Sequence, residues 1–206
     1  MNQITMKNNL DPALRKIEAE EDFESCLAGL GGASELISKL IVIRKFKKGD
    51  HLLKAGGYGN SSYSIISGCV RQYYLMDGEE KTTFFYTEGQ SIFCSLNGTQ
   101  NTKSRHYLSC VEDSTLTVLT REAEAKLFAH IPKLQEMSRQ SLKEELAIYQ
   151  EMLATYITTT PEERYANLMN DRPDLLNRVP QYQLASYLGV KPESLSRIRK
   201  RILNKA

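Results

Sequence analysis

The sequence has few of the residues that metal sites and disulfide scaffolds require. Its 206 residues include three histidines, four cysteines and no tryptophan. The cysteines are widely spaced and form no Cys-x-x-Cys pair, so neither a zinc site nor an iron–sulfur cluster is indicated. A metal enzyme built on a β-barrel would need clustered histidines, and the chain has no His-x-His pair. We therefore expect no bound metal, no cofactor and no catalytic residues.

Long hydrophobic runs are absent too. No stretch approaches the roughly 18 consecutive apolar residues of a membrane-spanning helix. The polar stretch Met1–Asp11 lacks the apolar core of a secretory signal. Hydrophobic residues make up 41% of the chain and charged residues 25%, which is ordinary for a folded globular protein. These features predict a folded cytoplasmic protein with no membrane partner.

The net charge of +2 hides an uneven distribution. Seven lysines and arginines lie between Arg178 and Ala206 against one acid, Glu193, so this end carries +6 and the remainder carries −4. A basic end on an acidic body favours a polyanionic partner. A solvated basic tail would have the same composition, so charge alone leaves both possibilities open.

The chain changes pattern near Thr120. Between Ile41 and Thr120, turn residues separate short β-rich runs, a spacing that predicts a barrel or roll. Asp77-Gly78 lies between two aromatic-rich runs and predicts a hairpin. The segments expected afterwards are helices at Glu122–His130, Lys133–Thr158 and Pro161–Met169 and a loop at Asn170–Arg178.

The helix expected at Lys133–Thr158 has two apolar stripes. One stripe repeats at intervals of four and three residues, the spacing of a coiled-coil seam. It consists of Leu142, Leu146, Tyr149, Leu153 and Tyr156. The other stripe, on a different face, consists of Ile148, Met152 and Thr155. Such a helix can pack on its own domain and on a second copy, so we expect a homodimer; burial in one larger core is the alternative.

Residues Gln181–Arg201, QYQLASYLGVKPESLSRIRKR, have the pattern of a helix-turn-helix. The first helix is followed by Gly189, which suits the left-handed turn that ends a helix. Pro192 opens the second helix, whose Leu195 and Ile198 are expected to face inward. The alternative is an ordinary helical hairpin on the surface.

The outward positions of the second helix suit contact with DNA. Arg197 can pair with O6 and N7 of guanine, and Glu193 can accept a hydrogen bond from N4 of cytosine. The basic residues that follow can hold phosphates, which adds affinity without sequence information. The candidate DNA-binding residues are Lys191, Glu193, Ser194, Ser196, Arg197, Arg199, Lys200 and Arg201.

Three segments resemble Crp/Fnr-type transcription regulators, especially the branch common in Bacteroidetes. They are RVPQYQLASYLGVKPESLSRIRKRI, TPEERYANLMNDRPDLLNRVPQ, and FKKGDHLLKAGG with the later YSIISGCVRQYYLMDGEEKTTFFYTEGQ. The resemblance covers roughly residues 35–204. By position, Glu193 and Arg197 match two base-reading residues of the family, and Pro192 stands where a third, usually arginine, is found.

The resemblance implies an α+β fold in three parts. These are an N-terminal cyclic-nucleotide-binding-like double-stranded β-helix (β-roll), a long dimerisation helix and a C-terminal helix-turn-helix domain. We expect the wing of that domain to be truncated or absent, because few residues follow the recognition helix. The expected boundaries are residues 1–132 for the sensing domain, 133–158 for the dimerisation helix and 159–206 for the DNA-binding domain.

The resemblance also implies an effector site in the roll. Cyclic-nucleotide binders of the family carry a Gly-Glu pair for the ribose and an Arg-Ser or Arg-Thr pair for the cyclic phosphate. Here Phe93-Cys94 replaces the first pair and Ser104-Arg105 is offset by about one place from the second, so we expect no control by cyclic AMP. The candidate walls of a pocket for another effector are Tyr73, Phe85, Phe93, Cys94, Arg105 and Tyr107.

Together these features predict a sequence-specific transcription regulator that acts as a homodimer on a near-palindromic operator. The expected partners are double-stranded DNA, a second copy of the chain and an unknown small-molecule effector, with RNA polymerase as a further candidate. One alternative is a roll that senses a ligand or thiol oxidation while its C-terminal helices contact a protein partner instead of DNA. The other is a metal enzyme on the roll, which the scarcity of histidine disfavours.

Overall fold

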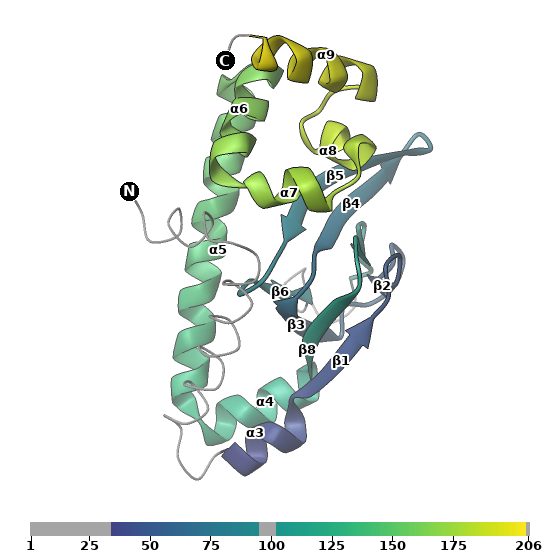
Figure 1. Cartoon of the computed structure of the whole chain (residues 1–206). Coiled ribbons are helices and arrows are strands. Elements are labelled where there is room, and N and C mark those ends of the chain that lie inside the picture. The colour runs from purple at the N-terminus through teal and green to yellow at the C-terminus, as the bar shows by residue number, and fades with distance from the viewer. Residues whose placement is uncertain (1–33, 95–101, 205–206) are drawn as a thin grey trace.

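The computed structural model describes residues 34–94 and 102–204. Figure 1 shows a group of β-strands, one long helix running beside them, and several short helices gathered at one end. In chain order, the elements are α3 (Ser34–Leu40), β1 (Val42–Phe46), β2 (His51–Leu53), β3 (Ser61–Ser67), β4 (Val70–Met76), β5 (Glu79–Tyr86), β6 (Ser91–Phe93), β7 (Tyr107–Cys110), β8 (Ser114–Thr120), α4 (Arg121–His130), α5 (Pro132–Thr158), α6 (Pro161–Asp171), α7 (Pro173–Arg178), α8 (Gln181–Tyr187) and α9 (Pro192–Leu203).

The strands form a β-roll of two four-stranded antiparallel sheets, which confirms the predicted fold class. The strand order is β1-β8-β3-β6 in one sheet and β2-β7-β4-β5 in the other. Branched aliphatic side chains pack into one core, because alternate residues of each strand face inward. Core members include Leu53, Ile65, Val70, Leu108 and Leu116.

The hairpin predicted at Asp77-Gly78 joins β4 to β5. Asp77 has a φ of 53° and Gly78 a φ of 79°. Two central residues with positive φ define the type I′ turn, whose twist matches that of the strands on either side. The resulting two-stranded ribbon extends from the roll toward the C-terminal helices (Figure 1).

The long helix α5 packs on the roll with one face and leaves another uncovered. Ile148, Tyr149 and Met152 lie against the core of the roll. On the other face, the side chains of Leu146, Leu153 and Tyr156 are 58%, 62% and 53% exposed. Ile148 and Met152 of the second expected stripe therefore pack within the domain, and most of the seam stripe lies open.

The C-terminal helices α6 to α9 share an apolar core that also includes Cys69, Phe85 and Val111 of the roll. Leu175, Ala185 and Leu195 are the most deeply buried of its helical members. Thr160 and Glu163 form a reciprocal capping box at the start of α6, which satisfies two backbone N–H groups.

The loop expected over Asn170–Arg178 is wrong. Helix α6 continues to Asp171, and Pro173 opens α7, the six-residue helix that follows. A proline is well tolerated in the first turn of a helix because the N–H it lacks has no partner there. Burial of Leu175 in the core then stabilises this short segment.

Within residues 34–94 and 102–204, no helix is long and apolar enough to cross a membrane. Within these same ranges, no three histidine, cysteine, aspartate or glutamate side chains lie close enough together to hold a metal ion.

Candidate nucleic-acid interface and effector pocket

Helix α9 is held by its apolar face and presents its polar face outward. Leu195 and Ile198 are buried with Leu184 and Leu188, as the spacing predicts. Gly189 has a φ of 70°, and a Cβ there would lie 2.5 Å from the hydroxyl of Tyr156. The turn between α8 and α9 therefore requires glycine for both its backbone conformation and its close contact with α5.

The structure brings the predicted DNA-binding residues together on one exposed element. Seven of the eight are exposed and Ser196 is half-buried. Arg201 forms an ion pair with Glu162 of α6 at 3.3 Å, so it also helps to hold α9 on its domain. Helix α9 lies at the end of the molecule farthest from α3 and α4 (Figure 1). Its polar face can thus meet a large partner such as a DNA duplex.

A buried ion-pair cluster attaches the C-terminal helices to the roll. We call it the interdomain clamp: Arg178 of α7 with Glu88 and Glu112 of the roll. The Arg178 guanidinium donates to Glu88 Oε1 and Oε2 at 2.8 and 2.9 Å and from Nε to Glu112 Oε1 at 2.9 Å. Sequence reasoning missed this cluster, because ion-pair partners that are 66 and 90 residues apart leave no local pattern.

Side chains of α8 reinforce this attachment. The Ser186 hydroxyl donates to the backbone carbonyl of Glu80 at 2.6 Å and accepts from the Thr82 N–H at 2.9 Å, both on β5. The rings of Phe85 and Tyr187 meet edge to face at 5.3 Å between centroids. The β4–β5 ribbon is therefore the platform on which the helix-turn-helix sits.

Arg164 connects the end of α5 with the turn of the helix-turn-helix. Its Nε donates to the carbonyl of Leu188 at 3.1 Å, and its Nη1 donates to the carbonyl of Thr159 at 2.6 Å. The guanidinium carbon lies 4.6 Å from the ring centroid of Tyr156. Tyr156 belongs to the predicted dimer seam. Arg164 therefore links that part of α5 to the turn before α9, and a shift of α5 would also displace this turn.

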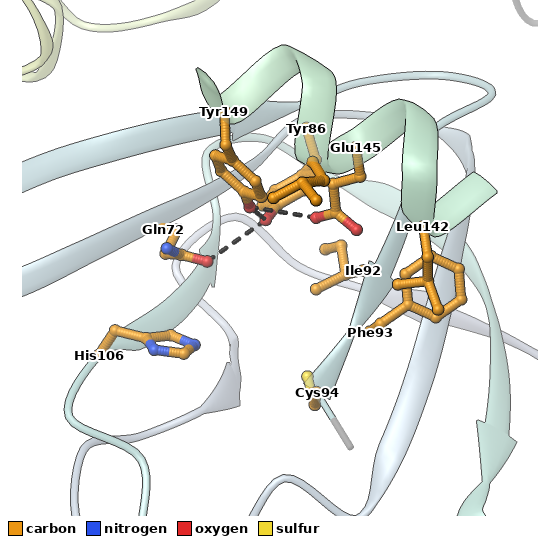
Figure 2. Close-up of a pocket in the computed structure, with 10 residues that line it drawn as sticks. Gln72, Tyr86, Ile92, Phe93, Cys94, His106, Leu142, Glu145 and Tyr149 are labelled. Carbon is orange, nitrogen blue, oxygen red and sulfur yellow. Dashed lines mark hydrogen bonds between the residues drawn. The ribbon is translucent and has the colours of Figure 1, made fainter. Parts of the chain in front are cut away.

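A pocket of about 200 Å³ lies between the roll and α5. We call it the α5 pocket, and Figure 2 shows its lining side chains converging from the strands and the helix. Its lining residues are Gln72, Tyr86, Ile92, Phe93, Cys94, His106, Leu142, Glu145, Leu146 and Tyr149. The helix therefore supplies one wall of the pocket.

A chain of hydrogen bonds crosses the α5 pocket. The hydroxyl groups of Tyr86 and Tyr149 lie 2.6 Å apart. The Tyr149 hydroxyl donates to Glu145 Oε1 at 3.1 Å, so the proton shared by the two hydroxyls comes from Tyr86, whose oxygen also lies 3.3 Å from Gln72 Oε1. Burial raises the pKa of the Glu145 carboxyl and of both tyrosine hydroxyls. His106 also lines the pocket, and burial lowers the pKa of its imidazole, which is therefore mainly neutral at pH 7.

Of the six residues predicted to form the pocket walls, Phe93 and Cys94 line the α5 pocket. The other four do not line it, but each is adjacent in sequence to a residue that does. Arg105 is exposed, and Tyr73 stacks on Tyr107 at 4.9 Å between centroids, outside the pocket. Phe85 belongs to the core shared with the C-terminal helices. The residues that line the pocket are the sequence neighbours Gln72, Tyr86 and His106. Successive side chains of an extended chain point to opposite faces, so the predicted residues face away from the pocket.

The predicted seam residues divide between two environments. Leu142 and Tyr149 are half-buried and line the α5 pocket, whereas Leu146, Leu153 and Tyr156 are exposed. Leu146 is both exposed and part of the pocket wall. The pocket and the open stripe are thus adjacent faces of one helix.

The cysteines within the described ranges are buried and unpaired. Burial raises the pKa of the Cys94 thiol to about 12 and that of Cys110 to about 11, and it raises the pKa of Cys69 as well. A thiolate is the reactive form, so these side chains are poor redox sensors. Cys26 lies outside the described residues.

Comparison with known proteins agrees with this geometry. Residues 43–130 match the family of cyclic nucleotide-binding domains. The chain is 26% identical over 173 residues to the fumarate and nitrate reduction regulatory protein of Vibrio cholerae, covering 77% of this chain and 68% of that protein. It is 24% identical over 167 residues to the transcriptional activator protein Anr of Pseudomonas protegens, covering 75% of this chain and 68% of that protein.

A solved structure of low sequence identity shares the fold. It is that of the c-di-GMP responsive global regulator CLP of Xanthomonas campestris, which superposes with a TM-score of 0.69 at 16% identity. The match covers 84% of this chain and 92% of that chain. The shared fold therefore extends well beyond residues 43–130.

Proposed function

We propose that this chain, a member of the Crp/Fnr superfamily of transcription regulators, reads a near-palindromic operator as a homodimer through α9. Members of this superfamily bind DNA and act as dimers. The curated relatives are transcription regulators and not enzymes. A protein with this role works in the cytoplasm, where its DNA is, and RNA polymerase is a candidate partner there.

The observation that carries the proposal is the exposed basic face of α9 on a buried apolar anchor. A recognition helix must enter the major groove without losing contact with its domain. Leu195 and Ile198 provide that contact, while Glu193 and Arg197 on the outer face are free to meet base edges. Arg199 and the other basic residues of α9 would contact the phosphates and set the register.

The open stripe of α5 supports the homodimer. Leu146, Leu153 and Tyr156 are large side chains that remain more than half exposed in the single chain. Two copies of the stripe can bury each other around a two-fold axis, because an isologous interface uses the same surface on both subunits. The axis would then pass beside α5 and place the two α9 helices on one side of the dimer.

The α5 pocket supports control by a small-molecule effector. It shares Leu142, Glu145, Leu146 and Tyr149 with the helix that would form the dimer. A ligand that binds one arrangement of α5 better than another shifts the population of dimer states. Arg164 would transmit the difference to the turn before α9.

The proposal is tested by selecting DNA fragments from a genomic library with purified wild-type protein. Arg197→Ala is run in parallel, and Arg105→Ala serves as a control that removes the same charge from an exposed position on the roll. We expect the wild type and Arg105→Ala to enrich one two-fold-symmetric motif. Arg197→Ala should bind that motif about 1–3 kcal/mol more weakly and with relaxed preference at one position in each half-site. Enrichment of no motif by the wild type, with or without a bound effector, would contradict the proposal.

A further inference from the structure

The α5 pocket is unsuited to an anion. Its described lining residues include no lysine or arginine, and its one charged group is the carboxylate of Glu145. His106 does not supply a positive charge at pH 7, because burial lowers its pKa. Arg105, the arginine nearest in sequence, has its side chain exposed to solvent. A phosphate placed in this pocket would face a carboxylate instead of a guanidinium.

Glu145 is held in place but not neutralised. Its Oε1 accepts a hydrogen bond from Tyr149, and its described surroundings contain no lysine or arginine within ion-pair distance. The Tyr86 hydroxyl also acts on this carboxyl through a hydrogen bond that lowers its pKa, and Figure 2 shows both tyrosines beside it. A carboxylate has about four acceptor positions, so two hydroxyls do not fill them. The desolvated carboxylate thus retains an acceptor, and a positive partner would relieve the cost of its burial.

The remaining walls of the pocket suit the apolar body of a small molecule. Ile92, Phe93 and Leu142 provide hydrocarbon surface, and the rings of Tyr86 and Tyr149 can attract a cation through their π faces. A dry apolar cavity of roughly 150 Å³ holds a benzene molecule. The volume of about 200 Å³ therefore fits one ring with a short amine side chain.

We propose that the α5 pocket binds a small organic cation, an amine with an apolar body, through the carboxylate of Glu145. The Tyr149 hydroxyl, which lies 2.6 Å from that of Tyr86, donates to this carboxylate and holds it at the cavity. The inference rests on the proposed function in one respect: the amine would be the effector that sets the arrangement of α5. Binding itself does not depend on DNA.

The test measures binding of three matched probes by calorimetry and ligand-observed NMR, without DNA. The probes are 2-phenylethylamine, its neutral analogue 2-phenylethanol and the anion phenylacetate, with cyclic AMP as a fourth ligand. They are tested on the wild type, Glu145→Gln and Glu144→Gln. Gln at position 145 keeps the shape and can still accept from Tyr149, and Glu144 is an exposed acid on the same helix, which makes it a matched control.

The amine should bind the wild type and Glu144→Gln equally, and at least about tenfold more weakly to Glu145→Gln, since a hydrogen bond to a charged group is lost. Phenylethanol should bind the wild type and Glu145→Gln alike, and the two anions should bind more weakly than the amine. Three results would each overturn the inference: no binding of the amine, equal binding of the amine to Glu145→Gln, or tighter binding of phenylacetate or cyclic AMP.

This outcome is separate from the test of DNA binding. If no DNA motif is enriched but the amine binds through Glu145, the proposed function fails and the ligand class stands. If a motif is enriched but the amine does not bind, the ligand class fails and the proposed function stands. Circular dichroism of Glu145→Gln confirms that a loss of binding does not come from a loss of fold.

Discussion

Replacing Arg178 with methionine should weaken the attachment of the C-terminal helices to the β-roll. The guanidinium is the centre of the interdomain clamp, with four hydrogen bonds of 2.5 to 2.9 Å to Glu88 and Glu112. The side chains of Arg178 and Glu88 are 12% and 4% exposed, whereas that of Glu112 is 32% exposed. Methionine keeps most of the volume and removes the charge, so Glu88 would be left buried without its cation.

The expected loss follows from that exposure. Removing one partner of a buried ion pair costs roughly 3–5 kcal/mol, because an uncompensated charge remains. Solvent can still reach Glu112, so we expect the lower end of this range, about 3 kcal/mol of unfolding free energy. Glu88→Gln added to Arg178→Met should recover part of the loss, since the amide removes the buried charge while its oxygen can still accept from the N–H of Gly68.

Urea denaturation followed by circular dichroism at one fixed protein concentration measures these effects, because the proposed dimerisation would make stability depend on concentration. Lys47→Met is the control: Lys47 and Asp113 form an ion pair whose side chains are 81% and 62% exposed. Exposed pairs contribute little, so this variant should unfold at the wild-type midpoint. If Arg178→Met also unfolds at the wild-type midpoint, or if the double variant is no more stable than Arg178→Met, the clamp does not hold the domains together.

Three further predictions concern other parts of the chain. Leu146→Asp combined with Leu153→Asp should convert the dimer to a monomer by placing carboxylates in the apolar stripe; light scattering measures the mass, and an unchanged dimer would refute the assigned seam. Gly189→Ala should lower the unfolding free energy by at least roughly 1–2 kcal/mol, the cost of a left-handed conformation with a Cβ, because the methyl group would also lie 2.5 Å from the Tyr156 hydroxyl; a denaturant titration that matched the wild type would show that the turn tolerates a side chain. With Cys26→Ser in place, the three buried thiols of the roll should react with a maleimide at pH 8 far more slowly than in urea, and rapid native labelling would revive the thiol-sensing alternative.

The helix-turn-helix could be predicted from the sequence because its signals are local. Gly189 ends the first helix, Pro192 opens the second, and Leu195 and Ile198 recur at helical spacing. Each signal depends on residues within one or two turns, and the packing in the structure agrees with all of them. The short helix α7 was missed because proline is common both in loops and in the first turn of a helix. Only the tertiary contacts of this segment distinguish a helix from a loop here.

The pocket was harder to predict because the last three residues of β5 are covered on both faces. Phe84, Phe85 and Tyr86 are all buried, two against the inside of the roll and Phe85 against the C-terminal helices. An apolar run gives no alternation from which to read the inward face. The register also shifts between Gln72 and its neighbour Tyr73, which changes which residues of the two strands lie opposite each other.

The contributions of α5 to the pocket depend on tertiary contact alone. Glu145 lies in a helix of mixed polar and apolar residues, and nothing in its local sequence separates it from Glu144. Only the packing of α5 against the roll shows that the first faces the cavity and the second faces solvent. The clamp between Arg178 and Glu88 is likewise visible only once the two domains are placed together.

The most direct test of DNA reading by a dimer is the affinity for the selected motif with both half-sites intact compared with one half-site scrambled. Fluorescence anisotropy across a range of salt concentrations gives both the affinity and its salt dependence. We predict half-sites centred about 34–36 Å apart, a large loss of affinity on scrambling either one, and a steep fall with salt. Equal affinity for the intact and scrambled duplexes would contradict the account, because two α9 helices related by a two-fold axis must read both halves.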